Sequence, residues 1–98
     1  MIVEVALTFN CQYIRCHTKV GRNIRKLQID FDKWLYDRKN KHPYWVPFPD
    51  GEGGEVYGVC FDAEAFIYWL NQVRFKKGKQ VAKLTGKPSF QPKKKIRF

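Results

Sequence analysis

Residues 61–79, FDAEAFIYWLNQVRFKKGK, constrain the fold more than any other segment, because their apolar side chains recur at the period of an α-helix. One stripe occupies positions i, i+3, i+4, i+7 and i+10: Ala63, Phe66, Ile67, Leu70 and Val73. Asp62 is suited to cap the first turn, and Gly78 is suited to end the last. Aromatic side chains at this spacing usually belong to a core, so we expect a helix over residues 62–77 that packs against the domain.

The same helix divides the chain electrostatically. Residues 1–73 carry nine Lys or Arg and nine Asp or Glu, whereas residues 74–98 carry ten Lys or Arg and no acid. The formal net charge of +10 therefore lies from the last turn of this helix onward. A concentration of positive charge of this kind predicts an anionic partner, and nucleic acid is the first candidate.

Length and composition indicate one small domain. A chain of 98 residues buries about 60% of the surface that it exposes when unfolded, and an aromatic content of 16% predicts a core filled by large rings. No apolar run reaches the ~18–20 residues of a membrane span, and the N-terminus lacks the pattern of a signal peptide, so we expect no membrane partner. Three cysteines argue against a complete disulfide framework. We therefore expect a cytoplasmic protein, or a nuclear one in a eukaryotic host; the small size would suit a virus-encoded protein.

Alternation of apolar and polar residues predicts strands before the helix. Residues 2–9 and 12–20 alternate in this way, and a turn signal at 21–23 follows the second run. Residues 24–31 are predicted as a third strand that forms a hairpin with the second. Ile24 is out of phase with that strand. Residues 55–61 are predicted as a fourth strand, leading into the helix.

Weaker signals complete the chain. Residues 32–39 predict a short helix, and residues 42–54 a loop with three Pro, three Gly and three aromatic residues. Residues 79–85 fit a helical turn or a strand equally well. Residues 86–92 have the composition of a turn-rich linker, and residues 93–98 that of a basic tail.

These segments predict an α+β fold in the order βββα-loop-βα. We expect a small antiparallel sheet of three to four strands, with the 62–77 helix packed on one face. Residues 1–78 would form the α+β domain, and residues 79–98 a basic C-terminal extension of the same domain.

Two basic segments are the candidate nucleic-acid contacts. The first is the predicted hairpin, which has no acid between positions 5 and 29 and contributes Arg15, His17, Lys19, Arg22, Arg25 and Lys26. The second is the C-terminal arm, which contributes Arg74, Lys76, Lys77, Lys79, Lys83, Lys93, Lys94, Lys95 and Arg97. Lys and Arg neutralise phosphates and release counterions, which gives affinity that is largely independent of sequence. The alternatives are a solvated sheet face for the hairpin and, for the arm, a solubilising tail, an import signal, or a contact to acidic proteins or headgroups.

Catalytic and metal-binding patterns are weak. Cys11, Cys16, His17, His42 and Cys60 lack the paired spacing of a zinc site, so we expect no metal and no cofactor. Asp30 and Asp32 with Glu4 could hold Mg²⁺ for phosphodiester cleavage, but Asp32 and Asp62 fit helix caps better. We therefore expect a binding protein that is not an enzyme, and a metal-dependent nuclease is the least favoured reading.

The middle of the chain suggests a rival function. Residues 42–73 contain five acids and no Lys or Arg, and the aromatic residues Tyr44, Trp45 and Phe48 lie in the 42–54 loop. Aromatic residues of this kind often anchor protein interfaces, although they also pack over the edges of cores. The rival to nucleic-acid binding is thus a protein-binding module, such as a small inhibitor or an accessory subunit of a nucleoprotein complex.

Overall fold

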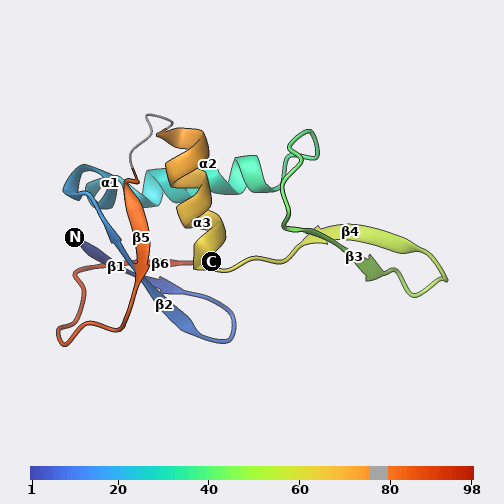
Figure 1. The fold of residues 1–98 in the computed structure, drawn as a ribbon. Coiled ribbons are helices and arrows are strands. Elements are labelled where there is room, and N and C mark those ends of the chain that lie inside the picture. The colour runs from blue at the N-terminus through green and yellow to red at the C-terminus, as the bar shows by residue number, and fades with distance from the viewer. Residues whose placement is uncertain (76–79) are drawn as a thin grey trace.

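The computed structural model describes residues 1–75 and 80–98 and has an α+β fold, as predicted. A four-stranded mixed sheet carries helices, and a separate two-stranded hairpin extends from this body (Figure 1). The elements of the described residues are β1 (Ile2–Ala6), β2 (Cys11–Cys16), α1 (Thr18–Arg22), α2 (Ile24–Leu35), β3 (Trp45–Pro49), β4 (Glu55–Val59), α3 (Ala63–Trp69), the π-helical turn η1 (Leu70–Arg74), β5 (Ala82–Thr85) and β6 (Lys94–Arg97).

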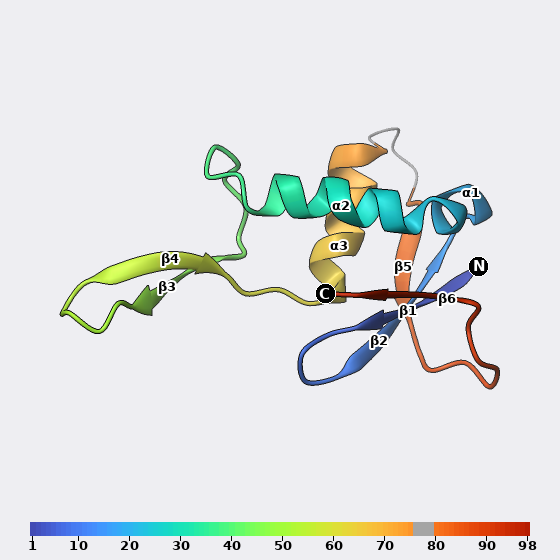
Figure 2. The same ribbon diagram turned by 180° about the vertical axis from the view of Figure 1, so that it is seen from behind.

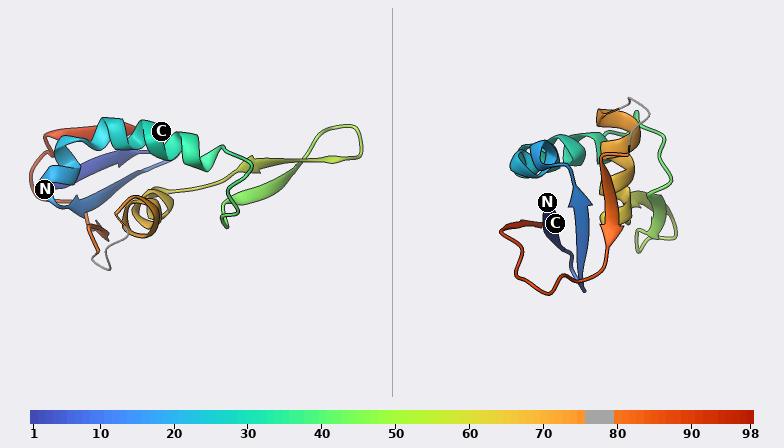
Figure 3. Two further views of the ribbon diagram at one scale, coloured as in Figure 1. Left: turned by 90° about the horizontal axis from the view of Figure 1, so that it is seen from above. Right: turned by 60° about the vertical axis from the view of Figure 1, so that its left-hand side comes forward.

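The main sheet has the strand order β5-β2-β1-β6. β2 pairs antiparallel with both β1 and β5, whereas β6 pairs parallel with β1. β5 and β6 therefore run in the same direction on opposite edges of the sheet. Residues 86–93 must return along the length of the sheet between them, and they do so on the side away from α2 and α3 (Figures 1 and 3).

The core lies between one face of the sheet and the helices (Figures 2 and 3). β1 and β2 contribute Val3, Val5 and Ile14, each with no exposed surface. Phe31 of α2 and Phe66 of α3 meet them, with their ring centroids 5.2 Å apart. The opposite face of the sheet has no helix packed on it in the part of the chain that the structure describes.

The strand predicted over residues 24–31 is wrong, because this segment is most of α2. Its buried residues recur at i, i+4, i+7, i+11 and i+15 from α1 through α2: Val20, Ile24, Leu27, Phe31 and Leu35. That spacing is helical. Ile24, which did not fit the alternation of the predicted strand, fits this helical spacing. The predicted strand 12–20 ends at Cys16, and α1 follows. The predicted basic hairpin therefore does not form; β2 pairs with β1 instead, and α2 replaces the short helix predicted over 32–39.

The sequence predicted an antiparallel sheet. The sheet is instead mixed, because the C-terminal segment joins it as a strand parallel to β1. Residues 94–97 form β6 where a basic tail was expected, and Ile96 places its side chain in the core with 2% of its surface exposed. The ambiguous 79–85 segment contains β5. The predicted domain boundary at residue 78 lies outside the described residues, but β5 and β6 complete the same sheet as β1 and β2.

The helix predicted over 62–77 is confirmed through its first turns. The Asp62 carboxylate accepts a hydrogen bond of 2.9 Å from the backbone N–H of Glu64, as expected of an N-cap. α3 then continues as the π-helical turn η1, and Leu70 remains fully buried. The last predicted turn, with its Gly78 stop, lies outside the described residues.

The predicted 42–54 loop is partly a strand. β3 pairs antiparallel with β4, so residues 45–59 form a hairpin, which we call the β3–β4 arm. The arm extends away from the end of the molecule that carries α1 (Figures 1 and 2). The molecule is consequently elongated, with principal extents of 48 × 30 × 19 Å.

Candidate nucleic-acid interface

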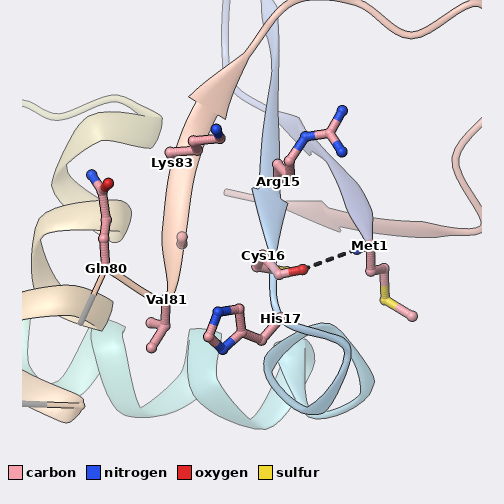
Figure 4. Close-up of a pocket in the computed structure, with 8 residues that line it drawn as sticks. Met1, Arg15, Cys16, His17, Gln80, Val81 and Lys83 are labelled. Atoms are coloured by element: carbon pink, nitrogen blue, oxygen red, sulfur yellow. Dashed lines mark hydrogen bonds between the residues drawn. The ribbon is translucent and has the colours of Figure 1, made fainter. Parts of the chain in front are cut away.

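The structure brings one cation from each predicted basic segment into direct proximity. Arg15 of β2 lies opposite Lys83 of β5 in the antiparallel register, and both side chains are exposed. Figure 4 shows both side chains projecting from neighbouring strands, with His17 beside the end of β2. Two neighbouring cations create a local region of positive potential. Like charges directly opposite each other on paired strands also destabilise the sheet.

Asn71 of η1 fixes the position of β5. Its side-chain oxygen accepts hydrogen bonds of 2.8 and 3.0 Å from the backbone N–H groups of Val81 and Ala82. Its side-chain nitrogen donates a 2.9 Å bond to the carbonyl of Ala82. One amide side chain therefore satisfies three backbone groups at the start of β5. This contact anchors the chain directly before Lys83, which the β2–β5 pairing places opposite Arg15.

A surface pocket of about 360 Å³ lies between the start of β5 and the end of β2. Its lining includes Arg15, His17, Gln80 and Lys83, which are exposed donors (Figure 4). Cys16 also borders the pocket, but burial raises the pKa of its thiol. That thiol is therefore protonated at neutral pH, and the pocket is suited to holding an anion without a nucleophile.

A second pocket, of about 280 Å³, joins the same two segments of the sequence. Lys19 of α1 and Lys26 of α2 line it together with Arg74 at the end of η1. The guanidinium carbon of Arg74 lies 4.7 Å from the centroid of the Phe75 ring, which holds this side chain against the surface. Asp30 is the only acid that lines this pocket among the described residues, so cations exceed acids at its rim.

We call the group formed by Arg15, His17, Lys19, Lys26, Arg74 and Lys83 the α1-end cluster. Arg22 of α1 and Arg25 of α2 are exposed on the neighbouring helices. Lys94 lies beside Val3 near the start of β1, at the same end of the sheet as Arg15, and Lys93 precedes it. Lys76, Lys77 and Lys79 lie outside the described residues.

Two of the predicted contacts are placed elsewhere. Lys95 forms an ion pair of 3.0 Å with Glu4, whose residue is only 7% exposed, so part of the charge of Lys95 is used inside the protein. Arg97 lies beside Ala6 at the opposite end of the sheet and borders a different pocket, near the C-terminus. Among the described residues, Lys95–Glu4 is the one side-chain ion pair within 4.0 Å, so no carboxylate at that distance neutralises the α1-end cluster.

The structure does not assemble the nuclease site that the sequence suggested. Asp30 and Asp32 lie on α2 and not on a strand, and they border different pockets. Glu4 is held by Lys95 on β6. Burial raises the pKa of Asp32, which is neither a helix cap nor a partner of Asp30. In residues 1–75 and 80–98, no three His, Cys, Asp or Glu side chains gather to hold a metal.

The predicted protein-binding aromatics divide between two roles. Trp45 stacks on His42 with ring centroids 5.1 Å apart, and its indole nitrogen donates a 2.8 Å hydrogen bond to the carbonyl of Asn40. Tyr44 packs on His42 at 5.4 Å, so both aromatics fasten the root of the β3–β4 arm. Phe48 is 43% exposed on the arm itself.

The sequence pattern did not single out Tyr13. It is paired with Thr85 on one side and Glu4 on the other, so it lies on the same helix-free face as Arg15. The only signal for this placement was the alternation of residues 12–20, which predicts that Tyr13 and Arg15 share the solvent side of a strand.

Comparisons with known proteins found no match for this chain. No protein-family model matches the chain, and neither a curated protein nor a solved structure resembles it significantly. In the described part of the chain, none of the helices has both the length and the apolar character needed to span a bilayer.

Proposed function

We propose that this protein binds nucleic acid through its sugar–phosphate backbone, without a catalytic role, and that the α1-end cluster is the contact surface. The observation that carries the proposal is that Arg15 and Lys83 lie opposite each other on adjacent strands, and in residues 1–75 and 80–98 no carboxylate lies within 4.0 Å of either. Isolated cations are common on protein surfaces and need no partner. Cations held opposite each other without a neighbouring acid repel, and a bound anion would offset that repulsion.

The form of the surface favours a polyanion over a small anion. The cations that border the two pockets come from five elements, β2, α1, α2, η1 and β5, and not from one enclosed site. A chain of phosphates could contact several of these positions in succession. Contacts of this type give register and affinity but no base reading, so binding should be largely independent of sequence. Tyr13 on the same sheet face could add stacking on an unpaired base.

We also propose that the protein acts in a reducing compartment, the cytoplasm or the nucleus. The structure has free thiols at Cys11, Cys16 and Cys60, two of them exposed. Free thiols persist in the reducing cytoplasm or nucleus, where nucleic acid is also present.

The decisive experiment is a salt-titrated binding assay with fluorescent single- and double-stranded DNA and RNA. The Arg15→Gln/Lys83→Gln variant should flatten the plot of log K against log[salt] by about 1.4–1.8, because each lost phosphate contact removes about 0.7–0.9. Lys33→Gln/Lys39→Gln removes the same charge at exposed positions outside the cluster and is the matched control. Equal slopes for the two variants would refute the assignment of the surface.

Point substitution is required, because removal of the C-terminal segment would not test the basic contacts alone. Ala82 and Ile96 are each 2% exposed in the core, and β5 and β6 form both edges of the sheet. A truncation after residue 78 would therefore unfold the sheet as well as remove charge.

The rival proposal, a protein-binding module, is favoured by a different observation. The β3–β4 arm exposes Phe48, Val56 and Tyr57 at 43%, 53% and 53%. Affinity capture with and without nuclease treatment separates the proposals: a stoichiometric protein that remains after digestion supports a protein partner, and loss of all bound material supports nucleic acid.

A further inference from the structure

The helix-free face of the main sheet holds an aromatic ring next to the opposed cations. In one row across the strands, Tyr13 lies between Thr85 of β5 and Glu4 of β1. In the neighbouring row, Arg15 and Lys83 lie opposite each other. Residues i and i+2 of a strand share a face, and their Cα atoms are about 6.6–6.8 Å apart. Tyr13 is therefore the next side chain on this face after the phosphate contact that we propose.

The charge of this face is positive. Four exposed cations share it by register: Arg15, Lys83, Lys95 and Arg97. Among the strand residues that point to this side, Glu4 is the single acid. That residue is 7% exposed, and its carboxylate lies 3.0 Å from the ammonium group of Lys95. No exposed carboxylate of the four strands is thus present on this face to repel a phosphate.

A surface pocket of about 450 Å³ adjoins Tyr13. Leu84, which is 42% exposed, adds an aliphatic surface to its lining, and Gln12 and Thr85 add polar groups. Lys87 adds a cation from the segment that returns on this side of the sheet, and Tyr13 is only half-buried with that segment in place. These groups match the parts of a nucleotide, which are a flat base, its polar edge and a phosphate.

This arrangement favours an unpaired strand over a duplex. In a duplex the faces of the bases are stacked on one another, and only their edges reach the grooves. The outer strands of a four-stranded sheet are about 14 Å apart. The sheet face therefore cannot enter a major groove about 12 Å wide. An unpaired strand can lie along an open sheet and turn its bases onto aromatic rings.

We infer that the bound nucleic acid is single-stranded, and that the Tyr13 pocket holds one unpaired base whose neighbouring phosphate contacts Arg15 and Lys83. The inference rests on the function proposed above, and it adds the state of the strand and the position of a base. DNA and RNA both supply this chemistry. Because every base has a face that can stack on a ring, the selection is for an unpaired base and not for a sequence.

The first test compares a short single strand with the blunt duplex of the same sequence, as DNA and as RNA, by fluorescence anisotropy at constant salt. The wild-type protein should bind the single strand about tenfold more tightly, since only unpaired bases can stack on Tyr13. Equal or tighter binding of the duplex, with a steep salt dependence, would overturn this inference and leave the proposed function standing. Failure to bind any of these nucleic acids would overturn both.

The second test removes the ring. Tyr13→Leu keeps an apolar side chain on β2, and it should lower the affinity for the single strand by about tenfold without changing the salt slope, because stacking releases no counterions. Tyr13→Phe restores the ring and should restore the affinity. Tyr36→Leu, which removes a ring that is 59% exposed at the end of α2, is the matched control. Equal affinities of Tyr13→Leu and Tyr36→Leu would refute the base position.

A third measurement uses the wild-type protein and so does not depend on how a variant folds. The NMR resonances of the Tyr13 ring protons should move upfield when the single strand is added, because a stacked base shields them with its ring current. The duplex should not cause this shift. Tyr13 resonances that stay in place at saturating single strand would refute the stacking.

Discussion

Phe31 is the residue around which the core is organised. Five other rings lie within 6.1 Å of its centroid: Trp34, Phe61, Phe66, Trp69 and Phe98. These rings come from α2, the segment before α3, α3 itself and the C-terminus. One buried side chain therefore couples the helical layer to the last residue of the chain, and it brings the segment that carries β6 into the core.

Phe31→Ala should lower the free energy of unfolding by about 3–5 kcal/mol, because it leaves a cavity between packed rings. Chemical denaturation monitored by tryptophan fluorescence measures the change. Ile29→Ala, which removes a side chain of α2 that is 57% exposed, is the matched control and should have a small effect. Equal losses for the two variants would contradict this packing.

Asp50 should titrate below its usual pKa of 3.8, because its carboxylate accepts hydrogen bonds of 2.8 and 3.0 Å from the N–H groups of Glu52 and Gly54. A lowered pKa in the folded state gives stability that is present above pH 3.8 and is lost as the pH falls through the folded value. NMR titration of the carboxyl carbon measures this directly. Asp50→Asn should remove the effect, and titration at or above 3.8 would contradict the turn.

At the level of elements, single contacts between segments position the interface. η1 holds β5 through Asn71, and β5 in turn places Lys83 opposite Arg15. The arm is fastened in a similar way, since the indole of Trp45 bonds to the carbonyl of Asn40 and stacks on His42. Side chains of this kind decide how the elements are placed relative to one another.

Asn71→Ala should lower the free energy of unfolding by about 1–3 kcal/mol, because it leaves partly buried backbone groups of β5 without partners. Amide hydrogen exchange should accelerate at Val81 and Ala82 before the rest of the sheet. Gln72→Ala, at the neighbouring exposed position, is the control. Unchanged exchange at both amides in Asn71→Ala would show that the side chain does not hold β5.

At the scale of the whole molecule, charge is separated along the long axis. The α1-end cluster lies on the main body, whereas Asp50, Glu52 and Glu55 lie at the tip of the arm that extends away from it (Figure 1). A net charge of +10 is self-repulsive, and the described residues contain one side-chain ion pair, Lys95–Glu4, to offset it. Salt screens that repulsion. The free energy of unfolding, as well as the affinity for an anion, should therefore depend on the salt concentration.

Thermal stability should rise with ionic strength between about 0.01 and 0.15 M, because the Debye length contracts from about 30 to about 8 Å. The rise should be smaller in Arg15→Gln/Lys83→Gln than in the wild type, since a pair of like charges on directly opposed strand positions is removed. Lys33→Gln/Lys39→Gln again serves as the equal-charge control. Scanning calorimetry across a salt series measures the difference, and identical salt dependence in all three proteins would contradict an accumulation of charge at β2 and β5.

The sequence alone determined the features that are local: the α3 stripe with its Asp62 cap, the first two strands, the α+β class and the charge imbalance. Helical period and capping act within a few residues, so they are readable without knowing the fold. Only the tertiary structure decided that residues 24–31 are helical, that β6 pairs parallel with β1, and that Arg15 meets Lys83. These features depend on partners distant in the chain. The burial of Phe31 and Ile96 against such partners outweighs the short alternation and the charge that had suggested a strand and a free tail.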